Sequence, residues 1–250
     1  PADHAHAGDD AVRAHLARNG RATLLIDGQR VDLESHALVW VLPAQDAGWI
    51  ARSPDFQVST VVWPRALIDA AVAAGADALL AQPSASVLAR MLSGETTRAL
   101  APLLGDLALQ DDGQVVADGL RYALSRLWHA WRQAPVDLPV RAVHPAVANA
   151  ARLLRHSVDA LDASALGASV GLSADHLGRS FSEQLGVSLV DYRNGQCLDR
   201  LLASLHAGER NLELAARAAG FGSYAQFHRV FRRALGTSPR AFVARLADRS

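Results

Sequence analysis

The 250-residue sequence contains no lysine, and all 25 of its permanently charged basic residues are arginines. Codon bias in a GC-rich genome accounts for this absence, although guanidinium groups also suit bidentate contacts with phosphate or guanine. The single cysteine, Cys197, excludes an internal disulfide and fits a reducing compartment. No apolar run reaches the length of about 18 residues that a membrane helix needs. Because no export signal is recognisable either, we expect a cytoplasmic protein that does not enter a membrane.

The sequence also lacks the common motifs of nucleotide binding and hydrolysis. Neither a P-loop nor a G-x-G-x-x-G pattern occurs. Residues 167–171 fit the G-x-S-x-G pattern of hydrolases, but that motif requires a strand before the serine and a helix after it. Ser169 instead lies at the end of an expected helix. We therefore expect no enzymatic activity and no cofactor.

The formal net charge is zero, yet the charge is divided unevenly along the chain. Residues 1–140 carry 11 arginines against 16 aspartates and glutamates, whereas residues 141–250 carry 14 against 9. The overall neutrality therefore conceals a basic C-terminal half.

The N-terminal part has the pattern of short strands. Four apolar or alternating segments are bounded by turn residues: 22–26, 29–33, 38–42 and 57–63. Asp27-Gly28 between the first two is a typical hairpin turn. Such strands at close intervals predict a small antiparallel barrel or sandwich over about residues 15–64.

Alanine- and leucine-rich segments follow and predict helices over residues 65–80, 85–92, 96–109 and about 113–134. The last of these carries large apolar residues at intervals of four, three and four: Leu120, Leu124, Leu127 and Trp131. A heptad-like seam of this kind forms either a dimer interface or an internal packing surface. Three prolines within residues 135–145 mark a domain boundary, and we expect domains over 1–138 and 144–250.

The C-terminal half nearly repeats itself at an offset of 50 residues. Six residues recur in the same order: Leu177, Arg179, Phe181, Leu185, Gly186 and Ser188 return as Phe227, Arg229, Phe231, Leu235, Gly236 and Ser238. In each copy the apolar residues fall at helical spacing and an arginine lies between them, so each unit has a buried face and a free cationic face. This duplication predicts two DNA-binding units that contact DNA together.

The first copy has the order of a helix-turn-helix, with helices over 163–170 and 174–185 around a turn at 171–173. Its candidate DNA contacts are Ser173, Ala174, Asp175, Arg179 and Ser182. Arg179 is able to donate two hydrogen bonds to a guanine edge. Asp175 either accepts from cytosine N4 or caps the helix and orients Arg179.

The second copy repeats this order, with helices over about 212–219 and 223–235. We expect Tyr224, His228 and Arg229 near base edges or sugars, and Arg232, Arg233 and Arg240 at phosphates. Ser223, at the start of the second helix, is a further candidate DNA contact. Between the copies, residues 189–205 predict a rigid helix about 25 Å long. Two recognition helices on one side of B-DNA lie about 34 Å apart, so a shorter rod predicts that the DNA bends.

Residues 172–192 and, more closely, residues 220–242 resemble the AraC/XylS family of bacterial transcription regulators. The family signature is present as Gly220-Phe221, as a Phe-x-Arg-x-Phe core over 227–231, and as Gly-x-Ser-Pro over 236–239. The resemblance extends from near His144 to near Leu246. It implies two helix-turn-helix subdomains joined by a linker helix, which bind adjacent major-groove segments of double-stranded promoter DNA.

The N-terminal strands resemble, more weakly, the cupin-type barrel that many members of this family place before the DNA-binding part. That resemblance implies a small-molecule effector inside the barrel and a dimer contact through the helices that follow, a role for Leu120, Leu124, Leu127 and Trp131. Four aromatic residues are candidate apolar walls of the effector pocket, or equally ordinary core: Trp40, Trp49, Phe56 and Trp63.

One alternative is a cupin-type metal-binding protein or enzyme with an appended DNA-binding domain. His4 and His6 have the spacing of a metal-binding pair. However, Asp46 follows Pro43 where a metal cupin usually offers a histidine, and we expect no metal site. The sequence thus predicts an α+β protein, with a small cupin-like β-barrel and helices before an all-α domain of two helix-turn-helix subdomains. We expect a dimeric regulator that responds to an effector, with RNA polymerase as a further possible partner.

Overall fold

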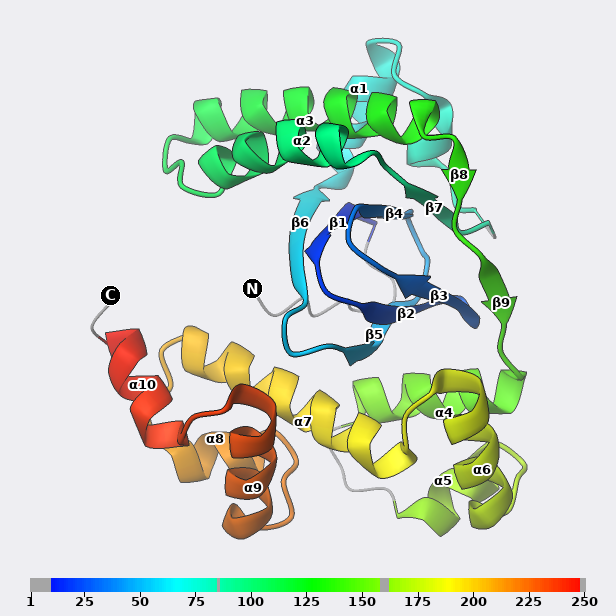
Figure 1. Cartoon of the computed structure of the whole chain (residues 1–250), viewed down its shortest axis with the longest axis vertical. Helices are drawn as coiled ribbons and strands as arrows, with labels where there is room; N and C mark the ends of the chain where they lie inside the picture. Colours follow the sequence, from blue (N-terminus) through cyan, green and yellow to red (C-terminus); the bar gives the residue numbers. More distant parts are fainter. Residues whose placement is uncertain (1–9, 85, 158–161, 248–250) are drawn as a thin grey trace. The chain divides into compact units, whose positions relative to one another are not determined.

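The computed structural model describes residues 10–84, 86–157 and 162–247 (Figure 1). The chain divides into two compact units, with the division between Ala142 and Val143. The first unit contains the sheets together with helices, and the regular elements of the second unit are helices. The prediction of an α+β protein with a helical C-terminal region is thus confirmed.

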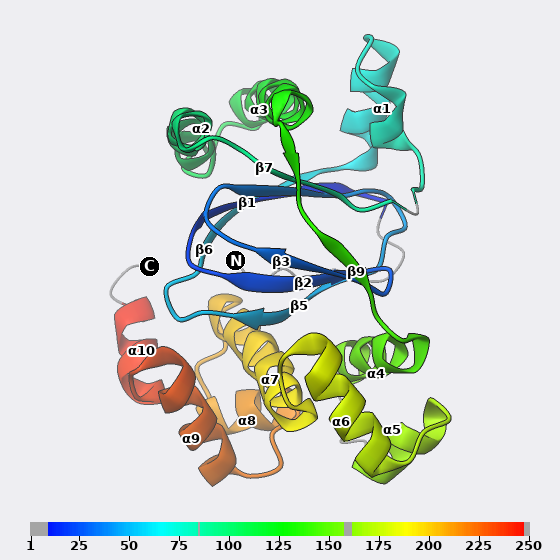
Figure 2. The ribbon, with the colours of Figure 1, turned by 45° about the vertical axis from the view of Figure 1, so that its right-hand side comes forward.

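The strands of the first unit form two sheets. Their bounds are β1 (Val12–Asn19), β2 (Ala22–Ile26), β3 (Gln29–Leu33), β4 (Ala37–Val41), β5 (Ala47–Arg52), β6 (Gln57–Trp63), β7 (Leu88–Met91), β8 (Val136–Asp137) and β9 (Val140–Ala142). One sheet has the order β6-β1-β4-β7-β8 and the other the order β5-β2-β3-β9. The sheets face each other in Figure 2, but they are not closed into one barrel, so the predicted barrel is corrected to two open sheets.

Strand β4 shows how the sequence pattern produces the layers. All five of its residues are buried, with alternate side chains on opposite faces of the sheet. Ala37, Val39 and Val41 pack in the core between the two sheets, whereas Leu38 and Trp40 pack in a second core that helices cover. A continuous apolar run was therefore required, because both faces of this strand are covered.

The helices of the first unit are α1 (Arg65–Ala73), the short 3-10 helix η1 (Ala78–Ala81), α2 (Gly94–Leu107) and α3 (Gly113–Gln133). Two predictions are wrong here. The helix expected over 65–80 ends early, near Gly75, which has a φ of +98°. The helix expected over 85–92 is instead strand β7, which pairs antiparallel with β4. Pairing with a distant strand overrides the helical composition of this segment.

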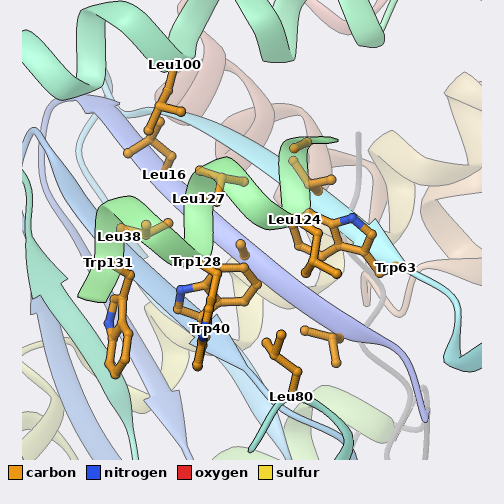
Figure 3. Close-up of a cluster of buried hydrophobic side chains, with 14 of the residues drawn as sticks. Leu16, Leu38, Trp40, Trp63, Leu80, Leu100, Leu124, Leu127, Trp128 and Trp131 are labelled. Atoms are coloured by element: carbon orange, nitrogen blue, oxygen red, sulfur yellow. The ribbon is translucent and has the colours of Figure 1, made fainter. Parts of the chain in front are cut away.

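The apolar seam of α3 packs inside its own unit. Leu124, Leu127 and Trp131 are at most 9% exposed, and Leu120 packs partly buried against the same cluster. Figure 3 shows α3 over the sheet, with Trp128 beside Trp40. The outer face of the sheet presents large apolar side chains that need a cover, and α3 supplies it. The predicted dimer interface is therefore corrected to internal packing, since the seam is already covered within one chain.

The proline-rich segment is not a free linker. Strand β8 pairs with β7, and β9 pairs with β3 through the partners Val140 and Val31. The first unit therefore extends to Ala142, beyond the boundary predicted from the prolines. Only Val143 and His144 separate β9 from the first helix of the second unit.

The second unit is built from seven helices in the described ranges: α4 (Pro145–His156), α5 (Ala163–Ser169), α6 (Ala174–Leu185), α7 (Leu189–His206), α8 (Leu212–Ala218), α9 (Tyr224–Leu235) and α10 (Pro239–Ala247). Their ends explain the 50-residue repeat. Gly186 and Gly236 end α6 and α9 with φ of +77° and +65°, a left-handed conformation that suits glycine. Ser188 and Ser238, two residues on, accept hydrogen bonds from backbone N–H groups of the helices that follow.

Of the helices in the described ranges, none combines the length and the apolar character that a membrane crossing needs.

Candidate nucleic-acid interface

The second unit contains two helix-turn-helix motifs, α5–α6 and α8–α9. In the first motif the two helices approach closely at Gly167, where an added Cβ would lie 2.6 Å from the carbonyl oxygen of Leu172. Only glycine allows this approach without a shift of the backbone.

The buried face of α6 fixes which residues it exposes. Leu177, Phe181 and Leu185 are buried, and the ring of Phe181 lies 5.5 Å from that of Tyr192 on α7. The Tyr192 hydroxyl donates to the carbonyl oxygen of Ala151 on α4, at 3.2 Å. Since this face is covered by α4 and α7, the opposite face of α6 is left for a partner.

The predicted contacts of α6 lie on that opposite face or at its start. Ser173, Asp175, Arg179 and Ser182 are exposed, and Ala174 is half-buried. The capping role considered for Asp175 belongs to Ser173, whose hydroxyl oxygen accepts from the backbone N–H of His176 at 3.3 Å. In the described part of the chain, the Asp175 carboxylate makes no ion pair with Arg179. It therefore does not hold that guanidinium in place.

The second motif has an aromatic core and a polar outer face. Phe227 and Phe231 are fully buried on the inner face of α9, with ring centroids 5.7 Å apart. On the outer face, five residues of α9 line one shallow hollow: Tyr224, Ala225, His228, Arg229 and Arg232. The structure thus brings together four of the residues predicted to contact DNA.

An adjacent hollow adds further cations to this face. Arg240 and Arg210 line it together with Tyr224 and Glu213, and the phosphate contact expected of Arg240 stays a prediction. Arg210 was not predicted. Its guanidinium donates to the carbonyl oxygen of Leu205 at 2.9 Å, and its position in the loop directly before the N-cap Asn211 was the available signal.

Arg233 lies on the flank of α9. One of its guanidinium nitrogens is 3.5 Å from a carboxylate oxygen of Asp191 on α7, and its side chain remains 81% exposed. Ser223, at the start of α9, is exposed and its hydroxyl oxygen accepts from the backbone N–H of Gln226 at 3.2 Å. Ser223 therefore caps the helix in the same way as Ser173 caps α6.

Helix α7 connects the two motifs through specific polar contacts. The guanidinium of Arg200 donates from Nε to the carbonyl oxygen of Ala219, at 3.1 Å, and from Nη1 to that of Arg155, at 3.2 Å. These two carbonyls lie at the C-terminal ends of α8 and α4, where helices have unpaired acceptors. One side chain therefore ties α7 to α8 of the second motif and to α4, the helix that packs against α6 of the first motif, and Figure 1 shows α6 and α9 near opposite ends of α7.

The residues proposed as effector-pocket walls separate into two pairs in the first unit. Trp40 and Trp63 are fully buried and stack at 5.4 Å in the core under the helices. Trp49 and Phe56 lie 5.4 Å apart and pack against the core between the sheets. The four side chains do not form one wall, because the outward position of Trp40 in β4 directs it toward the helices.

His4 and His6, the candidate metal pair, lie outside the described residues. Within residues 10–84, 86–157 and 162–247, no three histidine, cysteine, aspartate or glutamate side chains come together as ligands for a metal ion. The nearby His15 forms a hydrogen bond with the hydroxyl of Thr60 at 3.0 Å.

Comparison with known proteins bears on the second unit. A family model described as a helix-turn-helix domain matches residues 166–245. No curated protein matches the chain.

Solved structures similar to the chain include ToxT from Vibrio cholerae, with 12% identity over 94% of this chain and 90% of that chain and a TM-score of 0.46. A protein from Listeria innocua has 24% identity over 40% of this chain and 97% of that chain, with a TM-score of 0.38. The AraC-like transcriptional activator CuxR has 16% identity over 85% and 73%, with a TM-score of 0.35.

These TM-scores are too low to support an argument about function. The observations that bear on function are the family model and the geometry of the helices. Both agree with the residues that carry the AraC/XylS resemblance. The chain therefore carries a helix-turn-helix domain of the AraC/XylS type over residues 166–245.

Proposed function

We propose that the protein is a transcription regulator that reads promoter DNA with two recognition helices, α6 and α9, and that a small molecule controls this binding. The observation that carries the proposal is the outer face of α9. Tyr224, His228, Arg229 and Arg232 line one hollow there, in a region that matches a helix-turn-helix family model. A recognition helix contacts base edges in the major groove with side chains on such a face.

The proposed contacts divide by chemistry. Arg229 and Arg179 each present a guanidinium able to donate two parallel hydrogen bonds to guanine O6 and N7. Tyr224 and His228 offer weaker, adaptable contacts to bases or sugars. Arg232, Arg240 and Arg210 surround the same face and neutralise phosphates, which contributes affinity without sequence preference.

The span of α7 bears on the shape of the bound DNA. With 18 residues at 1.5 Å per residue, α7 is about 27 Å long. Two successive major-groove segments on one face of B-DNA lie about 34 Å apart. Because Arg200 ties α7 to α8 of the second motif and to α4, which packs against α6 of the first motif, we expect the spacing between the motifs to be held and the DNA to supply the difference by bending.

A homodimer remains part of the proposal, but the seam of α3 does not provide its surface. Leu124 and Leu127 are buried within one chain, and exposing them for a partner would open the core that they close. Contact with RNA polymerase also remains a prediction.

Selection of bound sites from random double-stranded DNA, followed by sequencing, tests the function. We expect two different half-motifs whose centres are about one helical turn, 10–10.5 base pairs, apart. The Arg126→Ala variant is a matched control, because Arg126 is an exposed arginine of α3 in the first unit, and it should select the same sites. Enrichment of a single half-motif would contradict reading by two helices, and no enrichment would contradict the function.

A further inference from the structure

A cavity of about 500 Å³ lies in the first unit between the α1–η1 segment and one face of α3. It is separate from the core between the two sheets, where the barrel resemblance placed an effector. Its volume is within the range of about 300–1,000 Å³ that small-molecule sites occupy. Cavities of this size in proteins usually combine an apolar floor with a few polar groups that fix the orientation of a ligand.

The floor of this cavity is apolar and rigid. Leu80, Leu124 and Trp128 line it, and all three are at most 7% exposed. The Trp128 ring stacks on Trp131 at 5.0 Å and meets the edge of Trp40 at 5.1 Å. With neighbours on both sides, the indole cannot turn without disturbing the core.

The rim of the cavity carries basic side chains. Arg121, His129 and Arg132 lie on the same side of α3 and line the cavity, with Asp77 of the opposite segment as the only carboxylate among its lining residues. The Asp77 carboxylate accepts from the backbone N–H of Leu79 at 3.1 Å, and Arg121 pairs with Asp118 at 2.5 Å. In the described ranges, the guanidinium of Arg132 has no carboxylate partner and is available to an anion.

We infer that this cavity binds a small organic carboxylate with a compact apolar body. The body would rest on Trp128, Leu80 and Leu124, and the carboxylate would accept from Arg132, whose planar fork matches two carboxylate oxygens. An inorganic anion would leave the apolar floor in contact with water, and a neutral apolar molecule would leave the rim unused. The combination therefore selects molecules that carry both parts.

The cavity also adjoins the segment that leads to the second unit. Arg132 and Gln133 line it and are the last residues of α3, directly before β8 and β9. A ligand held between η1 and this end of α3 would restrain that segment. The role of this ligand as the effector rests on the proposed regulatory function, whereas its binding does not.

Calorimetric titration of the full chain tests the inference with three probes: benzoate, cyclohexanecarboxylate and hexanoate. We expect at least one to bind with one site per chain, and its neutral amide to bind at least tenfold more weakly, because the charge-assisted hydrogen bonds are lost. Inorganic phosphate should bind more weakly than that carboxylate. The inference is overturned if none of the three carboxylates binds, or if the amide binds equally well.

Three variants locate the site. Arg132→Gln should weaken carboxylate binding about tenfold or more, and Ala76→Trp, which fills the cavity, should abolish it. Arg126→Gln is the matched control, because Arg126 is an exposed arginine of the same helix whose guanidinium lies over the Tyr122 ring instead of in the cavity. Binding that is unchanged in both cavity variants would overturn the assignment, and melting temperatures of all three verify that they are folded.

A gel-shift assay with a selected DNA site separates the two proposals. A carboxylate that binds as expected and changes DNA affinity supports both. If the carboxylate binds in the cavity while DNA affinity is unchanged, the site stands and its effector role is wrong. If no DNA site can be selected at all, the regulatory function fails while the binding result remains valid.

Discussion

The two helix-turn-helix motifs share one core design and differ in their surfaces. Both begin their recognition helix at a capping serine and bury a phenylalanine in its middle, and both end it at a left-handed glycine. Outside this core, α6 carries one arginine and two acidic residues, Asp175 and Glu183, whereas α9 carries three arginines and no acidic residue.

The difference indicates how binding is divided between the motifs. The core, capping and terminal glycine residues recur at the 50-residue offset, whereas of the other outward-facing positions of α6 and α9 only Arg179 recurs, as Arg229. The face of α9 carries three arginines, whereas α6 offers a single cation beside a carboxylate. We therefore expect the second motif to contribute most of the affinity and the first to contribute mainly discrimination.

The largest expected effect tests whether the two cores are equivalent. Phe181→Ala and Phe231→Ala each remove a fully buried ring and should each lower the free energy of unfolding by about 3–5 kcal/mol. Urea denaturation measures this loss, and Phe→Leu at the same positions should cost less. A loss under about 1 kcal/mol in either variant would show that the two cores are not built alike.

Base readout is tested by Arg179→Ala and Arg229→Ala. Each should weaken binding to the selected site by about 1–3 kcal/mol and relax the preference at one base position. Binding measurements on the selected site and on singly substituted sites distinguish these effects. An equal loss on all sequences would assign that arginine to the phosphate backbone instead of a base edge.

The connection between the motifs is tested by Arg200→Lys. An ammonium cannot reproduce the two divergent hydrogen bonds of the guanidinium, so the variant should lose about 1.5 kcal/mol of stability. It should also tolerate DNA sites whose half-motifs are one base pair closer or further apart. Arg152→Lys, at an exposed position of α4, is the control. A variant with unchanged spacing preference would show that Arg200 does not set the distance.

The smallest expected effect exchanges one surface residue between the motifs. Ser182 and Arg232 occupy equivalent positions of the repeat, and both are exposed. Arg232→Ser should reduce the slope of log affinity against log salt by about 0.9, and Ser182→Arg should raise it by a similar amount. Titrations between about 50 and 200 mM salt measure both slopes. Opposite shifts would establish that charge, and not the core, distinguishes the motifs.

Much of the fold follows from local signals that the sequence carries. The bounds of β2, β3 and β6 match the predicted segments because alternation, a positive-φ turn at Asp27-Gly28 and flanking prolines act within a few residues. The helices from α5 to α9 match for the same reason, since capping side chains of serine, aspartate or asparagine mark their starts and glycines end α6 and α9.

The remaining features depend on distant contacts. Strand β7 was predicted as a helix because its alanines and leucines favour one, and only pairing with β4 makes it a strand. The spacing of the apolar residues along α3 suits packing against a partner chain as well as it suits packing against the sheet of the same chain. The two aromatic pairs, Trp40 with Trp63 and Trp49 with Phe56, were separated by strand orientation. Arg210 joined the proposed DNA-facing surface only once α8 and α10 were folded beside it.

The pairing of β8 with β7 and of β9 with β3 determines where the protein can be cut. A fragment that stops at the first proline of the connecting segment would lose both short strands and leave the edges of β7 and β3 with unpaired backbone groups. Bare edges of this kind recruit other chains, so such a fragment should aggregate. Soluble expression of either half is therefore expected when the chain is divided at Val143. The proline-containing segment, which the sequence suggests as a domain boundary, instead supplies an edge strand to each sheet.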